Sequence, residues 1–299
     1  MTARLLVIAG PTASGKSALA LDAARALDGE IVSVDSMQLY RDLPVGTAQP
    51  SAAERAEIPH HLVGVYDLAE RAEVFRYRDE ADAAIADIRR RGKCPILCGG
   101  TGLYFKALLD GLDDLPADRA LRAELDANYD FDAGESALVD RMAALDPAAL
   151  EKWRHCRRRL IRALEVKLLT GRSITELQRG GGGRRYRDVR FFVLENENGV
   201  LRQRIADRAR AMLRGGWIEE AEAVIRKGLF QTPTAHQALG YRLISDFLEG
   251  RFDREELWRR ICTATWQYAR RQRTWFRHQH PEAEKLAAGL EKSFWRATL

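Results

Sequence analysis

The sequence predicts an α/β fold, with a parallel sheet at its core and a helical insertion domain, and three observations indicate it. A phosphate-binding motif directly follows the first apolar run of the chain. A long middle block has apolar residues at helical spacing and no strand pattern. Short apolar runs of the length of buried strands alternate with helical patterns. These runs lie at 5–9, 30–34, 95–98 and 189–195.

The first run, Leu5 to Ala9, leads into the sequence GPTASGKS. Its two glycines bracket four residues and are followed by lysine and serine, which is the spacing of a P-loop, G-x-x-x-x-G-K-[ST]. The glycines let backbone N–H groups turn inward, and the positive end of the following helix, expected from Ala18 to Leu27, points at the same place. The motif predicts a P-loop NTPase-like core but not a reaction. The candidates for binding a diphosphate or nucleotide are Gly10, Pro11, Thr12, Ala13, Ser14, Gly15, Lys16 and Ser17.

Polar residues and glycines follow the next two runs. Asp35 and Ser36 come after 30–34, and because ligands of open α/β sheets sit beyond the carboxyl ends of the strands, Asp35 is expected near the P-loop. It could be a magnesium ligand, a general base or a turn residue. Gly99, Gly100, Thr101 and Gly102 follow the third run, where glycines allow the backbone to approach a ligand closely.

The segments between these runs are expected to be loops and helices. GTAQP (46–50) and IPHH (58–61) are expected to be loops, in which the two histidines order the chain and bind no metal. An amphipathic helix is expected from Glu73 to Arg90, and another begins at Leu103. The apolar side of the first contains Ala81, Ala84, Ile85 and Ile88.

The middle block is expected to form a separate domain at 113–187, between core segments 1–112 and 188–299. Gly180 to Gly183 is expected to be a flexible link. The apolar residues at helical spacing are Leu121, Leu125, Leu138, Met142, Leu145, Leu150, Leu160, Leu164 and Leu168.

Helices are expected in the last third of the chain. One, from Leu201 to Leu213, has Leu201, Ile205, Met212 and Leu213 on one face and Arg204 and Arg208 on another, and it ends at Gly215 and Gly216. The run from Trp266 to Phe276, WQYARRQRTWF, interleaves basic and aromatic residues. Such composition suits a nucleic-acid surface, because arginines meet phosphates and rings stack on bases.

Composition narrows the class of protein. The 299 residues are 46% hydrophobic, which is enough for a sizeable core, and no apolar run is long enough to span a membrane. Four cysteines without C-x-x-C spacing are expected to be reduced and structural, in a cytoplasmic protein without a signal peptide. From Lys152 to Arg190 the net charge is +10, and from Arg251 to His280 it is +5, against +5 for the whole chain. Two basic segments on an otherwise acidic chain indicate a polyanionic partner, although solvated helix faces also carry charge runs.

Taken together, several stretches resemble one family, the tRNA dimethylallyltransferases, also called tRNA isopentenyltransferases. They occur in the order of the family and span nearly the whole chain. These stretches are GPTASGKS (10–17), SVDSMQLY (33–40), VGTAQP (45–50), PHHL (59–62), GGTGLYFKALLDGL (99–112), RLIRALEV (159–166), QALGYR (237–242) and YARRQRTWFR (268–277).

The resemblance implies transfer of a dimethylallyl group from dimethylallyl diphosphate to the N6 amine of the adenosine 3′ of the anticodon of tRNA. Asp35 would be the base, while Lys16 and Mg²⁺ held by Ser17 would stabilise the leaving diphosphate. Thr12, Thr101 and Arg208 would contact the reacting groups or the diphosphate, and the target base would be flipped into the protein. The residues implied in tRNA contact are Asp35, Ser36, Met37, Gln38, Thr101, Arg122, Arg158, Arg159, Leu160, Ile161, Arg162, Gln237, Ala238, Leu239, Gly240, Tyr241 and Arg242.

Three positions depart from the family pattern: Gln49 stands where lysine is usual, His155 to Arg159 replaces H-P-N-D-x-x-R, and Trp266 replaces an arginine. Two other classes of protein are possible. A small-molecule P-loop kinase would share the motif and Asp35 but leaves the basic segments unexplained. An RNA-binding protein without covalent chemistry explains the charge but not the residues at the strand ends. A monomer is expected.

Overall fold

The computed structural model describes residues 4–178, 183–286 and 294–295. The chain divides into two compact units. The larger unit comprises Met1–Leu109 and Tyr186–Leu299, and the smaller unit comprises Asp110–Arg185. Each is described by itself below.

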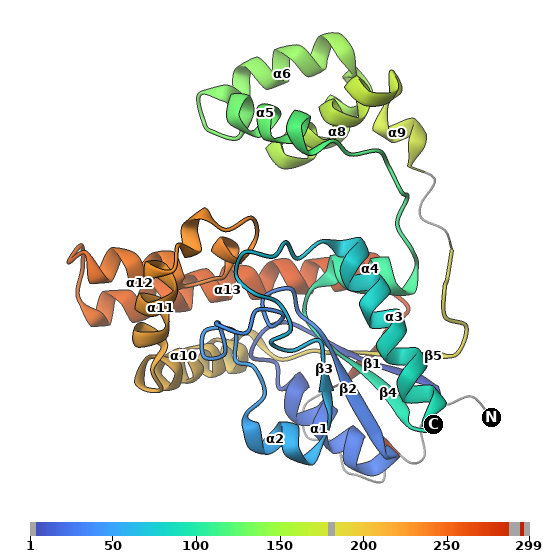
Figure 1. Ribbon diagram of the computed structural model, residues 1–299, viewed down its shortest axis with the longest axis vertical. Coiled ribbons are helices and arrows are strands. Elements are labelled where there is room, and N and C mark those ends of the chain that lie inside the picture. Colours follow the sequence, from blue (N-terminus) through green and yellow to red (C-terminus); the bar gives the residue numbers. More distant parts are fainter. Residues whose placement is uncertain (1–3, 179–182, 287–293, 296–299) are drawn as a thin grey trace. The chain divides into compact units, whose positions relative to one another are not determined.

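A parallel sheet forms the core of the larger unit (Figure 1). Its strand order is β3-β2-β4-β1-β5-β6, so β1 lies between β4 and β5, with Val7 beside Leu97 on one side and Phe191 on the other. Strands buried on both faces need continuous apolar sequence, which is why the four apolar runs became β1, β2, β4 and β5. The α/β class is confirmed. The strands are β1 Leu5–Ala9, β2 Gly29–Val34, β3 His60–His61, β4 Cys94–Gly99, β5 Val189–Leu194 and β6 Glu284–Leu286.

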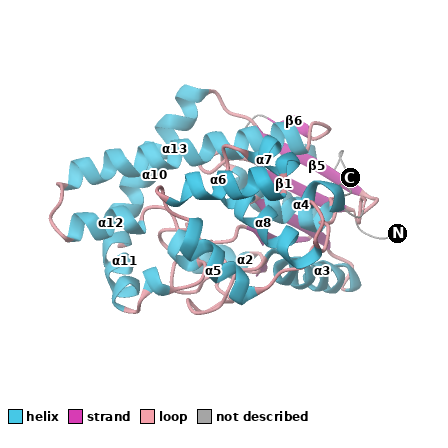
Figure 2. Ribbon diagram, turned by 90° about the horizontal axis from the view of Figure 1, so that it is seen from above, coloured by secondary structure: helices cyan, strands magenta, loops and turns pink. Residues whose placement is uncertain are grey.

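Helices pack against both faces of this sheet. On one face, α1 buries Leu19, Ala20 and Ala23 against β1 residues such as Ile8. On the other, α3 and α4 bury Ile85 among others. Figure 2 shows the strands gathered toward one end of the larger unit and α10, α12 and α13 toward the other. The helices are α1 Lys16–Leu27, α2 Ala52–Glu57, α3 Val74–Arg90, α4 Gly102–Leu109, α10 Asn198–Arg214, α11 Trp217–Arg226, α12 Tyr241–Leu248 and α13 Arg254–Gln279, with 3₁₀ turns η1 Leu229–Gln231 and η2 Ala235–Gln237.

The smaller unit is a cluster of helices, and its described residues contain no strand. Asp118 caps α5 through the Leu121 N–H, and Asp146 caps α7 through the Ala149 N–H. The core includes Leu125, Leu138 and Trp153. The helices are α5 Arg119–Tyr129, α6 Gly134–Leu145, α7 Pro147–Trp153, α8 Arg157–Thr170 and α9 Ile174–Leu177.

The structure corrects several expectations. The segment IPHH is not all loop, because His60 and His61 pair with Ile31 and Val32 as the edge strand β3. Leu145 and Leu168, two of the apolar residues at helical spacing, are exposed and not part of the core. The glycine link lies outside the described residues except for Gly183.

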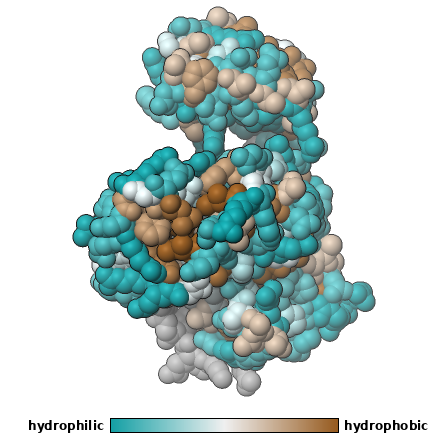
Figure 3. Space-filling model, turned by 60° about the vertical axis from the view of Figure 1, so that its left-hand side comes forward, coloured by the Kyte–Doolittle hydropathy of each residue, from teal (hydrophilic) through white to brown (hydrophobic). Residues whose placement is uncertain are grey.

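Three further observations concern the described chain as a whole. None of its helices combines the length and apolar character needed to cross a bilayer. All four cysteines are free thiols; Cys94 and Cys98 are buried, whereas Cys156 is exposed, so the expectation of a structural role does not hold for that residue. In Figure 3, hydrophilic side chains cover most of the visible face, and hydrophobic ones gather in a hollowed area of the larger unit.

Candidate active site

The P-loop lies between the end of β1 and the start of α1. Gly15 precedes α1 with φ +97°, a left-handed conformation that favours glycine, so the loop turns sharply into the helix. No side chain caps the first N–H groups of α1. These N–H groups and the positive end of the helix therefore point to a site that suits an anion.

The carboxyl ends of β1, β2 and β4 meet at one edge of the sheet and bring the predicted residues together. Thr12, Lys16 and Ser17 of the P-loop region line one cavity of about 330 Å³ with Asp35 and Arg208. Asp35 follows β2, and Arg208 lies on α10. The sequence predicted that Arg208 lies on a helix face away from the apolar residues. Residues far apart in the chain thus form one pocket.

The cavity is lined by two half-buried cations, Lys16 and Arg208, and by two carboxylates, Asp35 and Glu54. Burial lowers the pKa of Lys16; the charge of Arg208 lowers it further, whereas Cys98 and Asp35 raise it. Burial also lowers the pKa of Arg208, and Asp35 raises it. Lys16 Nζ donates to the Pro11 carbonyl at 3.2 Å. A bound anion would compensate for the burial of both cations, so the pocket suits a diphosphate or another phosphate group.

The turn after β2 holds Asp35 in place. Its Oδ1 accepts hydrogen bonds from the backbone N–H of Met37 at 2.9 Å and of Gln38 at 3.4 Å. Thr101, which follows β4, accepts a hydrogen bond from the Ser36 N–H at 3.1 Å through its Oγ1. Thr101 thus lies beside the Asp35 turn, and both side chains have a fixed place at the sheet edge.

A folded loop closes one side of the cavity. Gln38 Nε2 donates to the carbonyls of Thr47 and Ala48, at 3.2 and 2.9 Å. Gln49, one of the departures from the family pattern, lines the cavity and donates through Nε2 to the Gln38 and Tyr40 carbonyls. The side-chain amide of Gln38 is therefore engaged within the protein.

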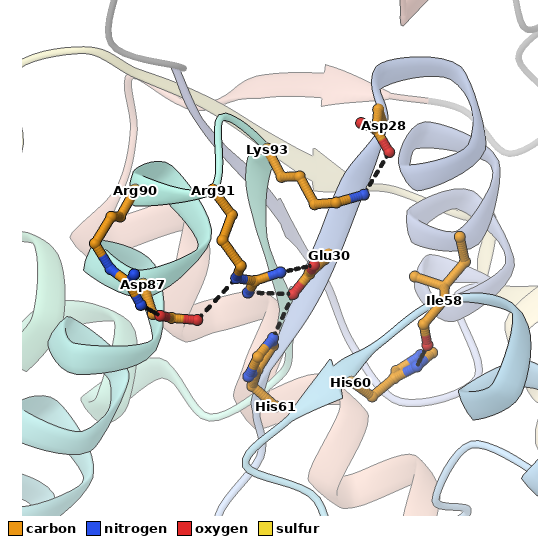
Figure 4. A network of polar contacts seen from close by, with 9 residues as sticks. All are labelled: Asp28, Glu30, Ile58, His60, His61, Asp87, Arg90, Arg91 and Lys93. Carbon is orange, nitrogen blue, oxygen red and sulfur yellow. Dashed lines mark hydrogen bonds and ion pairs between the residues drawn. The ribbon is translucent and has the colours of Figure 1, made fainter.

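The two histidines of β3 lie in different surroundings (Figure 4). His60 lines the cavity; its Nδ1 lies 2.7 Å from the Ile58 carbonyl, and burial lowers its pKa. His61 Nε2 lies 2.8 Å from the Glu30 carboxylate. The sequence suggested only that the pair orders a loop, and the apolar pattern that marks other strands is missing here.

Two side chains for which the sequence predicted no role in the site support the P-loop from outside the cavity. Arg204 Nη1 donates to the Ser14 carbonyl at 2.9 Å. Gln272, on α13, accepts a hydrogen bond from the Thr12 N–H at 2.8 Å and donates to the Gly100 carbonyl at 2.9 Å. The signal for Gln272 was available: a polar residue falls on the buried face of an otherwise apolar helix stripe.

The aromatic and basic run on α13 divides between interior and surface. Phe276 is 2% exposed and packs in the core, and Trp275 packs against the same core. Arg270, Arg271 and Arg277 are exposed. The structure therefore places Phe276 where it cannot stack on a base and leaves the arginines at the surface.

In the smaller unit, too, some of the residues predicted to contact tRNA are buried and others are exposed. Leu160 and Ile161 are each 1% exposed, within the core. Arg122 and Arg162 both pair with the buried Glu165, and Arg162 also donates to the carbonyls of Leu115 and Pro116. The exposed members of the set are Arg158 and Arg159.

The segment from Gln237 to Arg242 anchors a loop of the larger unit. Tyr241 and Ala238 are buried, and the Tyr241 hydroxyl donates to Glu220 Oε1 at 2.6 Å. Glu220 in turn accepts the N–H groups of Val45 and Gly46 at 2.6 and 2.8 Å. Gln237 and Arg242 are exposed, and Leu239 is half-buried before Gly240 opens α12.

Comparison with known proteins shows what this chain is similar to. The model of the IPP transferase family matches residues 38–279, and that of isopentenyl transferases matches 3–60. A tRNA dimethylallyltransferase of Methylococcus capsulatus is 46% identical over 95% of this chain and 92% of its own length, and one of Halorhodospira halophila is 47% identical over 93% and 91%.

Solved structures agree. The tRNA isopentenylpyrophosphate transferase of Bacillus halodurans has a TM-score of 0.71 at 34% identity and covers 99% of this chain and 94% of its own. A eukaryotic dimethylallyltransferase acting on tRNA has a TM-score of 0.78 at 29% identity, over 98% of this chain and 75% of its own.

Proposed function

This chain belongs to the IPP transferase family, whose curated relatives are tRNA dimethylallyltransferases, and on that premise we propose how its cavity carries out the reaction. The enzyme transfers a dimethylallyl group from dimethylallyl diphosphate to the N6 amine of the adenosine 3′-adjacent to the anticodon of tRNA and releases diphosphate. Phosphoryl transfer to a small molecule is not favoured.

One observation carries the assignment of the site: Lys16, Arg208 and Asp35 line a single cavity at the sheet edge. Lys16, Arg208 and the backbone N–H groups of the P-loop would bind the diphosphate of the donor. Asp35 would then face the amine of the incoming adenine. A kinase could use the same three groups, so it is the family match that favours substitution at the allylic carbon over transfer of a phosphoryl group.

Each group has a defined task in this substitution. The adenine amine is a weak nucleophile, because its lone pair is delocalised into the ring. Asp35 accepts the N6 proton as the nitrogen lone pair forms the new N–C bond. The carbon–oxygen bond to diphosphate breaks with its electron pair on the leaving oxygen. Lys16 and Arg208 stabilise that charge, and Thr12 and Thr101 orient the groups around it.

The donor set fits a magnesium ion held through Ser17. Its hydroxyl lines the same cavity as the Asp35 carboxylate, and no cluster of three or more His, Cys, Asp or Glu residues occurs among the described residues. Mg²⁺ typically takes one or two protein oxygens and completes its shell with phosphate oxygens and water. When bound, it supplies positive charge to the leaving diphosphate.

The exposed side chains among the residues predicted to contact tRNA are the ones that we propose meet it. Arg158 and Arg159 of the smaller unit and Gln237 and Arg242 of the larger unit are exposed members of the predicted set. The target adenosine would be flipped out of the anticodon loop to reach the cavity.

The test is a transfer assay with unmodified tRNA, Mg²⁺ and radiolabelled dimethylallyl diphosphate, with ATP as a parallel donor. We expect label in an anticodon-loop adenosine and no use of ATP. Asp35→Asn should lower kcat by about 10²- to 10⁴-fold, the usual contribution of a general base, while tRNA affinity is kept. The matched control is Asp79→Asn, an exposed aspartate on α3.

Two results would contradict this proposal in different ways. Consumption of ATP without label in the RNA would make the protein a kinase. Full activity of Asp35→Asn, alongside labelled tRNA, would leave the reaction standing but remove Asp35 as the base.

A further inference from the structure

Gln272 is a buried polar residue between two turns of the active site. It lies on α13 and is 6% exposed. Figure 1 shows α13 running from the α12 end of the larger unit toward α4, behind the active-site edge of the sheet. Its side chain reaches Thr12 of the P-loop and Gly100 of the turn after β4, which lie 260 and 172 residues away in sequence.

The two hydrogen bonds fix one orientation of the amide. Oε1 accepts from the Thr12 N–H at 2.8 Å, and Nε2 donates to the Gly100 carbonyl at 2.9 Å. Rotation of the amide by half a turn would set N–H against N–H and oxygen against oxygen. The approach is also close: a Cβ built on Gly100 would lie 2.2 Å from Nε2, so the contact requires glycine at that position.

Further hydrogen bonds extend this link to the base. The N–H groups of Gly100 and Thr101 donate to the Val34 carbonyl at 3.2 and 3.1 Å, and the Ser36 N–H donates to Thr101 Oγ1. Val34 and Ser36 flank Asp35. A continuous path of hydrogen bonds therefore runs from the P-loop through Gln272 to the turn that holds Asp35.

We propose that Gln272 is a positioning residue, which sets the spacing between the P-loop and the turns that hold Thr101 and Asp35. This inference rests on the proposed function, since that spacing matters only if donor and amine meet between those groups. Gln272 does not line the cavity, so we expect it to make no direct contact with substrate. Its effect would come through the geometry of Thr12 and Thr101.

The test compares kcat, KM, tRNA affinity and Tm of wild type and Gln272→Met, which has a similar length but makes neither hydrogen bond. Displacement of reacting groups by about 1 Å costs on the order of 100-fold in rate, so we expect kcat to fall by about that factor. The Kd for tRNA should stay within about twofold, because the exposed face of α13 is unchanged.

The control on the same helix is Trp258→Phe. The Trp258 indole N–H donates to the Ala206 carbonyl at 3.2 Å and lies outside the active-site cavity. This variant should lower Tm through loss of a hydrogen bond and leave kcat at the wild-type level. A kcat of Gln272→Met within about threefold of this control would overturn the positioning role, on the same scale of rate effects.

Gln272→Glu keeps the size of the side chain and the oxygen that accepts from Thr12, so it tests the hydrogen bond donated to Gly100 separately. This variant also serves as the test if Gln272→Met does not fold. An ionised carboxylate accepts from the Thr12 N–H but cannot donate to Gly100, whereas a protonated one can do both. The ratio of its kcat to that of wild type should therefore rise as the pH falls from about 8 to about 6, since burial favours protonation. A flat ratio would overturn the inference.

The two proposals fail in distinguishable ways. If wild-type enzyme leaves tRNA unlabelled, the proposed function fails. If wild type labels tRNA and the Gln272 variants match the control, only the positioning role fails.

Discussion

Among single residues, Glu30 gives the strongest prediction for the stability of the fold. The carboxylate lies in β2 with its side chain 2% exposed, and Arg91 binds both of its oxygens. His61 Nε2 approaches Glu30 Oε2 at 2.8 Å, and Asp87 holds the Arg91 Nε at 2.9 Å (Figure 4). Glu30 thus ties β3 to the sheet, and the other residue of β3, His60, lines the active-site cavity. The perturbation is Glu30→Gln.

The pKa of Glu30 sets the size of the effect. The hydrogen bonds from Arg91, with a smaller contribution from His61, lower this pKa from 4.5 to about 2, although burial raises it. At about 1.4 kcal/mol for each pH unit, this lowering corresponds to about 3 kcal/mol of stability. Because the folded-state pKa is the lower one, that stability is present above about pH 4.5 and is lost as the pH falls toward about 2.

Urea unfolding followed by tryptophan fluorescence measures the free energy of unfolding of the larger unit. Trp153 is the sole tryptophan within the smaller unit, out of six in the chain, so the signal reports mainly on the larger unit. Glu30→Gln should lower the free energy of unfolding by about 3 kcal/mol at about pH 7. The difference in this free energy between the variant and wild type should become smaller below about pH 4.5. Glu222→Gln, which removes an exposed pair with Arg226, should lose less than about 0.5 kcal/mol.

The pH dependence separates charge from packing. If Glu30→Gln and wild type differ by the same free energy at about pH 7 and about pH 3, the loss comes from poor fit of the amide and not from the ion pair. That result would refute the assignment of stability to the charge of Glu30.

Two further predictions follow from exposure. Arg159→Ala should weaken tRNA binding and reduce the steepness of log K against log salt concentration by about 1, because the contact of an exposed arginine with a phosphate releases about one counterion. An unchanged slope in Arg159→Ala would place the phosphate contacts elsewhere. Arg162→Ala should instead lower the Tm of the smaller unit, since Arg162 donates hydrogen bonds to the Leu115 and Pro116 carbonyls. The exposed Cys156 should react fast with a thiol reagent in native protein, whereas Cys94 should react only on unfolding, because it is buried and burial raises its pKa to about 11. Fast modification of Cys94 in native protein would contradict the placement of β4.

The parts of the fold that sequence predicted are those with a strong local signal. Buried parallel strands need only an apolar run, so β1, β2, β4 and β5 could be located within one or two residues. The edge strands β3 and β6 are too short for such a signal, and β3 consists of two histidines held by Glu30 and backbone pairing. Their existence depends on long-range contacts that one sequence does not reveal.

In the site, too, the residues with a local sequence signal were predicted and those without one were not. Lys16 and Ser17 follow from motif spacing, and Asp35 follows from the rule that ligands lie beyond the carboxyl ends of strands. The run on α13 was read by composition as a surface for nucleic acid, but its period places Ala269, Gln272 and Phe276 on a buried stripe. Helical periodicity could have separated these residues from the exposed arginines beside them.

The P-loop motif is local in sequence, but the geometry of the loop is not. β1 lies between β4 and β5, the Ser14 carbonyl is held by Arg204, and the Thr12 N–H is held by Gln272. β5, Arg204 and Gln272 all come from the chain that follows the smaller unit. Without that segment β1 would be an edge strand and two polar groups of the loop would lose their partners. The complete core, and not the motif alone, therefore holds the P-loop in the form that we propose binds a diphosphate.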